Sequence, residues 1–274
     1  MVDELSRRLV PDELWALTEP LIPRFEARPQ GGGTAPMDDR AVFTAIVFVL
    51  TSGCAWRYLP PSFGVTVPTA HRRFTAWTEA GLWRRLHRAV LDELGSQGLI
   101  DWSRAVLDGA SVRAKKGSMT GPNPVDRGKA GSKIHVMSDR AGLPLSVAIS
   151  AANTNDADAL KPLVKAVPAI KSRRGPRRRK PTKLHADKAY DHVELRKWVR
   201  DRGITVRIAR KGIESSKKLG RHRWVIERSI AWLFGYHRLS IRYDRKATHY
   251  LGFLTLAATL TCYKKLAKAG KTAT

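Results

Sequence analysis

Three acidic side chains stand in apolar segments of a chain that has 50 lysine and arginine residues against 24 aspartate and glutamate residues. Asp108 follows the letters AVL and Asp187 follows LHA, each at the close of an apolar strand pattern, while Glu227 lies in a predicted helix. Carboxylates near the carboxyl ends of neighbouring strands lie where open α/β sheets bind their ligands. We therefore consider these three acids as one candidate site.

Three carboxylates on such a frame suit the cleavage and transfer of phosphodiesters. That chemistry needs one oxygen activated for attack and another stabilised as it leaves, on opposite sides of one phosphorus. Two divalent cations about 3.5–4 Å apart can do both. Mg²⁺ and Mn²⁺ prefer oxygen ligands, whereas a histidine-rich set would indicate zinc. Asp108, Asp187 and Glu227 are thus predicted to hold two Mg²⁺ or Mn²⁺ ions.

Each acid also has a purely structural interpretation. Glu227 could pair with Arg223 one helical turn earlier, a contact worth about 0.2–0.5 kcal/mol. Asp108 could cap a turn, and Asp187 could pair with Lys188. For each acid taken singly, the structural interpretation is at least as plausible as metal binding. A site is favoured because all three acids occur together in one alternating order of strands and helices.

Strands alternate with helices after residue 100. Alternating apolar and polar residues predict the strands, and apolar residues three or four apart predict the helices. The order is βββαβαβα, followed by one further apolar helix. The predicted strands span 104–114, 133–139, 143–150, 183–187 and 204–210, and the predicted helices span 156–167, 192–203, 218–237 and 247–267.

The helix at 218–237, which carries Glu227, has an apolar set at helical spacing. We expect this set to pack the helix against the sheet and so to bring the glutamate towards the two aspartates. Its members are Trp224, Ile226, Ile230, Leu233 and Phe234.

Residues 1–100 have helical patterns only, which predicts a helical N-terminal domain before a catalytic domain at 101–274. A turn-rich connection at 54–64 is followed by a helix that begins after Thr66. With Arg72 and Arg73 on that helix, the arrangement is compatible with a helix-turn-helix reader of DNA. The alternative is an ordinary amphipathic helix with a core stripe.

The formal net charge of +26 indicates a polyanionic partner, nucleic acid before membrane lipid. The longest apolar runs, 41–50 and 251–263, are too short to span a bilayer. Two distant cysteines give neither a disulfide scaffold nor a thiolate zinc cluster. We expect a cytoplasmic protein that is associated with the nucleoid and not with a membrane.

Seven of the ten residues at 171–180 are basic, including Arg177, Arg178 and Arg179. A block of like charges can be a solvated loop. In a chain whose net charge already indicates nucleic acid, a phosphate-contacting arm is the favoured interpretation.

Several motifs occur together and in order: VLDGASVRA, GSKIHVMSDRAGLPLSVAISAANTNDADAL, LHADKAYD and RWVIERSIAWLFGYHRLSIRYDR. With SGCAWRYLPPSFG and RRFTAWTEAGLW before them, the chain resembles DDE transposases of bacterial insertion sequences in the five-like group, over nearly its whole length. The resemblance implies a ribonuclease H-like mixed sheet flanked by helices, in which the first and fourth strands are parallel neighbours.

By this resemblance Asp108, Asp187 and Glu227 are the metal-binding triad, and Arg223 is the arginine four residues before the glutamate. Many relatives have a tyrosine three residues before that arginine and a lysine seven residues after the glutamate, where this chain has Gly220 and Phe234. His237 and Arg238, about a turn later, could replace that lysine, and Arg242 and Tyr243 are further candidates. Of these we select Arg238.

Lys133 and His135 alternate on a strand next to the proposed catalytic strand and so share one face. They could contact DNA or face solvent.

The implied reaction is cleavage of DNA at the terminal inverted repeats of an insertion sequence, followed by joining to target DNA. Paired ends imply at least a homodimer on DNA. The alternatives are a catalytically inactive DNA-binding descendant of such an enzyme and a non-joining nuclease of the same fold.

Overall fold

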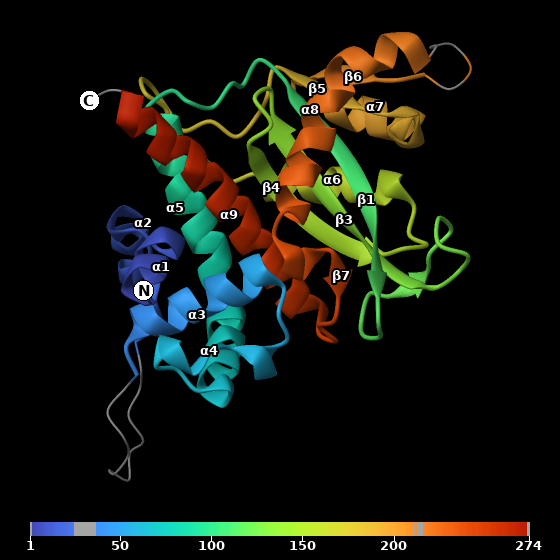
Figure 1. Ribbon diagram of the computed structural model, residues 1–274. Helices are drawn as coiled ribbons and strands as arrows, with labels where there is room; N and C mark the ends of the chain where they lie inside the picture. The colour runs from blue at the N-terminus through green and yellow to red at the C-terminus, as the bar shows by residue number, and fades with distance from the viewer. Residues whose placement is uncertain (1, 25–36, 211, 213–215, 273–274) are drawn as a thin grey trace.

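The computed structural model describes residues 2–24, 37–210, 212 and 216–272. A helical N-terminal part precedes a mixed sheet with helices on both faces (Figure 1). The helical part consists of α1 (Val2–Leu9), α2 (Asp12–Thr18), α3 (Asp39–Ser52), α4 (Val67–Glu79) and α5 (Leu82–Ser96), with short 3-10 turns at Glu19–Leu21, Trp56–Tyr58 and Pro61–Phe63.

Helix α4 begins and faces the core as its sequence predicts. The hydroxyl of Thr66 accepts a hydrogen bond from the backbone N–H of Thr69 at 3.4 Å, an N-cap contact. Phe74 and Trp77 are almost completely buried, so they form the core stripe that was the alternative to a DNA-reading role. Arg72 stays exposed on the same helix. The helix-turn-helix remains a prediction.

The sheet has five main strands in the spatial order β4-β3-β1-β5-β6. Strand β3 is antiparallel to β1 and β4, whereas β5 and β6 run parallel to β1. This is the order of a ribonuclease H-like sheet, with the first and fourth main strands as parallel neighbours. The strands are β1 (Ala105–Ala114), β3 (Ala130–Asp139), β4 (Pro144–Ala151), β5 (Lys183–Ala186) and β6 (Thr205–Ile208), with two-residue strands β2 (Gly121–Pro122) and β7 (Ile241–Arg242).

Helices cover the two faces differently. Helix α8 (Ser216–Phe234) packs on β1 and β3, while α6 (Asp156–Ala166) packs on β3 and β4. Side chains on a strand alternate between faces. In β1, Asp108 therefore points to one face and Gly109 to the other, where the carboxylate of Asp156 on α6 lies. Helix α7 (Val193–Arg200) contacts β6 and α6.

The C-terminal helix α9 (Ala247–Thr272) lies along α5 and also contacts β4 (Figure 1). One buried apolar cluster runs from Val10 through the sheet to Tyr263. The N-terminal helices and the sheet therefore share a core through α9. None of the helices in the described ranges is long and apolar enough to cross a membrane.

Candidate active site

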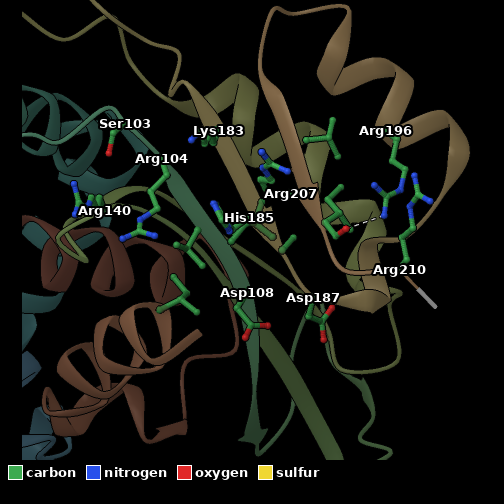
Figure 2. A pocket seen from close by; sticks show the side chains of 16 residues that line it. Ser103, Arg104, Asp108, Arg140, Lys183, His185, Asp187, Arg196, Arg207 and Arg210 are labelled. Atoms are coloured by element: carbon green, nitrogen blue, oxygen red, sulfur yellow. Dashed lines mark hydrogen bonds between the residues drawn. The ribbon is translucent and has the colours of Figure 1, made fainter. Parts of the chain in front are cut away.

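The register of β1 and β5 places the two aspartates side by side. Val106 lies beside His185 and Leu107 beside Ala186. One residue further along each chain are Asp108 and Asp187. Matched positions on parallel strands face the same side, about 4.8 Å apart. Both carboxylates accordingly point the same way and line one cavity of about 670 Å³ (Figure 2).

The prediction that Asp108 closes its strand is wrong. Strand β1 continues to Ala114, because β3 pairs with it from Ala105 to Arg113, with Val136 opposite Asp108. The strand that ends at this level is β5, whose last residue is Ala186. Asp108 thus lies where β5 leaves the sheet and β1 loses its parallel neighbour.

One backbone N–H fixes each aspartate. The N–H of Gly109 donates to Oδ1 of Asp108 at 2.8 Å, and that of Ala189 donates to Oδ1 of Asp187 at 2.7 Å. Both side chains are half-buried. No ion pair between Asp187 and Lys188 is found in the described part of the chain. Each carboxylate therefore accepts a hydrogen bond from a nearby backbone N–H, as in a turn, and still lines the cavity.

Tyr190, a residue for which the sequence predicts no role, lies beside this pair. Burial raises the pKa of its hydroxyl, and the nearby charges of Asp108, Asp156 and Asp187 raise that pKa further. The side chain is 1% exposed. Tyr190 thus holds a neutral hydroxyl group near the carboxylates of Asp108, Asp156 and Asp187. Its position after LHADKA, in the turn that follows β5, is the signal that could have identified it.

Glu227 lies on α8, beside the cavity but not in its lining. The preceding residue, Ile226, is buried and lines the cavity together with Asp108 and Asp187. The Glu227 side chain is exposed. Among the described residues, no three His, Cys, Asp or Glu side chains lie close enough together to hold one metal ion. The structure therefore brings the two aspartates together and puts the glutamate on a neighbouring element.

Helix α8 is attached to the turn between β3 and β4. The Arg228 guanidinium donates to the carbonyl of Ala141 at 2.7 Å, and the Ser229 hydroxyl donates to that of Gly142 at 2.7 Å. Both contacts directly follow Glu227 in the sequence. They fix the orientation of α8 relative to the sheet, and with it the direction in which Glu227 projects.

Two family models match the chain. Residues 10–87 match the family described as "Putative transposase of IS4/5 family", and residues 95–262 match the "Transposase DDE domain". The second match spans over half of the chain.

The chain belongs to the DDE transposases. Members of this family cut and join DNA, so the transposase is an enzyme that acts on DNA.

Curated relatives agree with this assignment. The "Putative transposase for insertion sequence element IS402" of Burkholderia cepacia is 43% identical over 150 residues, which cover 55% of this chain and 71% of that protein. The "Insertion element IS402 uncharacterized 16.2 kDa protein" of the same organism is 41% identical over 112 residues, 40% of this chain and 76% of that protein.

Solved structures are more distant. The piggyBac transposase synaptic complex with hairpin DNA is 10% identical, with a TM-score of 0.45 over 97% of this chain and 75% of that chain. A pre-cleavage Mos1 transpososome is 10% identical, with a TM-score of 0.32 over 88% and 83%. The fold of the transposase rests on its own strand order and not on these scores.

Lys133 and His135 lie on the face of the sheet opposite Asp108. Lys133 pairs with Asp156 at 3.1 Å and donates to the carbonyl of Thr154 at 2.9 Å. His135 is 1% exposed, and its Nε2 lies 2.8 Å from the hydroxyl of Ser150. Burial lowers the pKa of His135 to about 4. Both side chains therefore point towards α6 and away from the cavity, with His135 buried and Lys133 half-buried.

Arg238 is also internal. It is 5% exposed and pairs with both carboxylate oxygens of Asp244, at 3.0 and 3.3 Å. A third guanidinium nitrogen donates to the carbonyl of Cys54 at 3.0 Å. Helix α8 ends at Phe234, and the following turn directs Arg238 towards the α3 side of the core instead of the cavity. Its selection as a replacement for the family's lysine is not supported by this geometry.

The basic loop is folded onto the protein. The backbones of Ile170 and Arg178 exchange two hydrogen bonds of 2.8 Å. Arg177 pairs with Asp92 of α5 at 2.8 Å, and the Arg178 guanidinium lies 5.5 Å from the ring of Trp102. The loop is therefore an ordered, exposed basic segment, which keeps the phosphate-arm interpretation open.

The remaining basic candidates have mixed surroundings. Arg179 is exposed, whereas Arg73 pairs with Asp39 at 3.3 Å. The side chain of Arg223 lies outside the described part of the structure.

Proposed function

We propose that the transposase cuts DNA at the ends of an insertion sequence and joins them to target DNA with Asp108, Asp187 and Glu227 as its catalytic acids. The observation that carries this proposal is the matched register of β1 and β5, which sets the two aspartates on the wall of one cavity. Membership of the DDE transposases supplies the reaction.

The donor set fits divalent cations that prefer oxygen. Two half-buried carboxylates share one wall, and Glu227 on α8 can add a third from beside it. We infer that these three side chains hold two Mg²⁺ or Mn²⁺ ions. When bound, such a pair supplies activation of the attacking oxygen and stabilisation of the leaving oxygen. The two backbone N–H groups on Oδ1 of the aspartates keep both carboxylates oriented towards the cavity.

The partners follow from the same proposal. The terminal inverted repeats and the target DNA are the substrates, so the enzyme acts in the cytoplasm at the nucleoid. Two ends must be held together for joining, which requires a homodimer or a larger assembly on DNA. The proposed DNA contacts are basic residues that the sequence predicted for this role: the exposed Arg72 on α4, Arg178 and Arg179 of the basic loop, and Arg223.

A cleavage and joining assay tests the proposal. The purified chain is incubated with Mg²⁺ or Mn²⁺ and DNA that carries the ends of its insertion sequence. Asp108→Asn should abolish both cleavage and joining, since it removes one ligand charge from the site. Asp158→Asn is the matched control, because Asp158 is exposed on α6 and lies outside the cavity. Activity that persists in Asp108→Asn would refute the acidic site.

The same assay separates the alternatives. Specific binding of end DNA without cleavage under either metal would indicate a catalytically inactive DNA-binding protein. Cleavage without a joined product would indicate a nuclease of the same fold.

A further inference from the structure

The sheet face that carries the two aspartates continues into basic side chains. On β5, Lys183 points to the same side as Asp187, because positions four apart on a strand share a face. Arg207 on β6 pairs in register with His185, the same-face residue between them. Arg104 lies four positions before Asp108 on the neighbouring chain segment. All of these residues line the cavity that contains the acids, on one side of them (Figure 2).

Two arginines that line this cavity have acidic partners. Arg196 pairs with Asp191 at 2.6 Å, and Arg140 pairs with Asp101 at 3.4 Å. The side chains of Lys183 and Arg207 are exposed, as is that of Arg210, and none of the three makes a side-chain hydrogen bond or ion pair with a residue in the described ranges. Like charges gathered on one wall repel one another unless an anion lies between them.

We propose that Arg104, Lys183 and Arg207 form a phosphate track, which binds the backbone of the cut DNA strand on one side of the scissile phosphate. This inference rests on the proposed function, because the acids define where the cut is made. Lys183 lies about 13 Å along the strand from Asp187, at about 3.3 Å per residue. For a duplex whose axis lies parallel to β5, that length corresponds to about four base steps at about 3.4 Å of axial rise each.

The track is expected to hold DNA without reading its sequence. Lysine and arginine contacts to phosphate fix the register and orientation of a duplex, whereas base edges carry the sequence information. The phosphate track therefore positions the scissile phosphate over the aspartates, and the recognition of terminal repeats belongs to other surfaces.

A salt titration tests the track independently of catalysis. Binding of a fluorescein-labelled DNA duplex of arbitrary sequence is measured by anisotropy across a NaCl series, with Ca²⁺ present. Lys183→Gln combined with Arg207→Gln should make the slope of log K against log [NaCl] shallower by about 1.8, since each phosphate contact contributes about 0.9. The matched control is Lys165→Gln with Lys265→Gln, which removes two exposed lysines from α6 and α9 outside this cavity. The control slope should equal that of the wild type.

A second measurement connects the track to the acids. In single-turnover cleavage of end DNA with Mg²⁺, the Lys183→Gln, Arg207→Gln variant should need about tenfold more enzyme for half-maximal rate and reach the same maximal rate, because uniform binding is lost. Asp108→Asn should lose the maximal rate and keep the wild-type salt slope.

The outcomes separate the two proposals. If the track variant and its control have the same salt slope while the wild type cleaves DNA, the phosphate track is refuted and the proposed function stands. If the track variant has the shallower slope while the wild type cuts nothing, the proposed function fails and the DNA-binding surface stands.

Discussion

At the scale of single residues, the structure separates side chains that face the cavity from side chains that face the core. Asp108 and Asp187 share a cavity because two parallel strands are in register. Lys133 and His135 occupy the neighbouring strand, yet they point to the other side. The difference between a site residue and a core residue on this sheet is therefore one step of strand alternation.

His135 should make the transposase less stable in mild acid. Burial lowers the pKa of its imidazole from 6.5 to about 4 in the folded state, so the unfolded chain binds the proton more readily. The stabilisation is fully present above pH 6.5 and is lost as the pH falls towards 4. Urea unfolding at a series of pH values should show that this loss is about 1–3 kcal/mol smaller in His135→Gln. Parallel pH profiles for the two proteins would contradict the burial of a neutral histidine.

The acids could be predicted from the sequence because each follows or lies in an apolar segment with a strong pattern. The basic residues that line the same cavity could not be predicted with the same success. Alternation shows that Lys133 and His135 share a face, but it does not show that α6 covers that face. Counting back by twos from each aspartate would have found Arg104 and Lys183, which do line the cavity.

At the scale of elements, the strands and helices with long, regular patterns were predicted, and the order βββαβαβα is confirmed. Strands β2 and β7 were not predicted, since two residues are too few for a periodic signal. The prediction that Trp224 packs α8 against the sheet is wrong, because this side chain is 52% exposed. The Arg228 guanidinium instead lies between the rings of Trp224 and Trp232, at 4.5 and 4.7 Å from their centroids.

The contact between α8 and the β3–β4 turn should control both stability and catalysis. Gly142 has a φ of +89°, and a Cβ there would lie 2.9 Å from the Ser229 hydroxyl and 3.3 Å from Arg228. Gly142→Ala should therefore cost about 1–3 kcal/mol and slow DNA cleavage, because the helix that carries Glu227 must shift.

Gly175→Ala is the matched control for this prediction. Gly175 has the same φ of +89°, but nothing lies within 4 Å of a Cβ built there. Gly175→Ala therefore shows the effect of backbone strain alone. For both variants, urea unfolding gives the loss of stability and single-turnover cleavage gives the loss of activity. Equal losses of stability and activity in Gly142→Ala and Gly175→Ala would show that the attachment of α8 has no special role.

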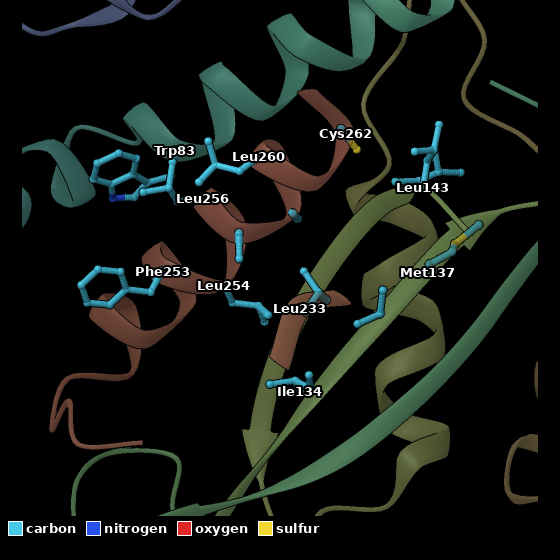
Figure 3. Packing of buried hydrophobic residues seen from close by; sticks show 14 of the residues in the cluster. Trp83, Ile134, Met137, Leu143, Leu233, Phe253, Leu254, Leu256, Leu260 and Cys262 are labelled. Carbon is cyan, nitrogen blue, oxygen red and sulfur yellow. The ribbon is translucent and has the colours of Figure 1, made fainter. Parts of the chain in front are cut away.

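At the scale of the whole molecule, α9 joins the helical N-terminal part to the sheet. Figure 3 shows this helix between Trp83 of α5 and the side chains of Ile134 and Leu233. Leu254, Leu256 and most of its neighbours on α9 are completely buried, as expected for a helix covered on several sides. The predicted division at residue 100 separates two patterns of secondary structure, while the apolar core continues across it.

Phe253→Ala should therefore destabilise the helical N-terminal part and the sheet together. Its ring is completely buried and stacks on Phe74 at 4.3 Å, so the change should cost about 3–5 kcal/mol. Hydrogen exchange followed by mass spectrometry should show faster exchange in both α4 and β3. Faster exchange confined to the N-terminal helices would show that the two parts unfold independently.

The central claim is that Asp187 binds a metal ion beside Asp108 during DNA cleavage, and a change of ligand atom tests it most directly. Asp187→Cys replaces an oxygen ligand by sulfur, which Mg²⁺ accepts poorly and the softer Mn²⁺ accepts better. We predict that end cleavage by this variant is lost with Mg²⁺ and partly restored with Mn²⁺, while the wild type cleaves with both. Cleavage by Asp187→Cys at the wild-type rate with Mg²⁺ would contradict the claim.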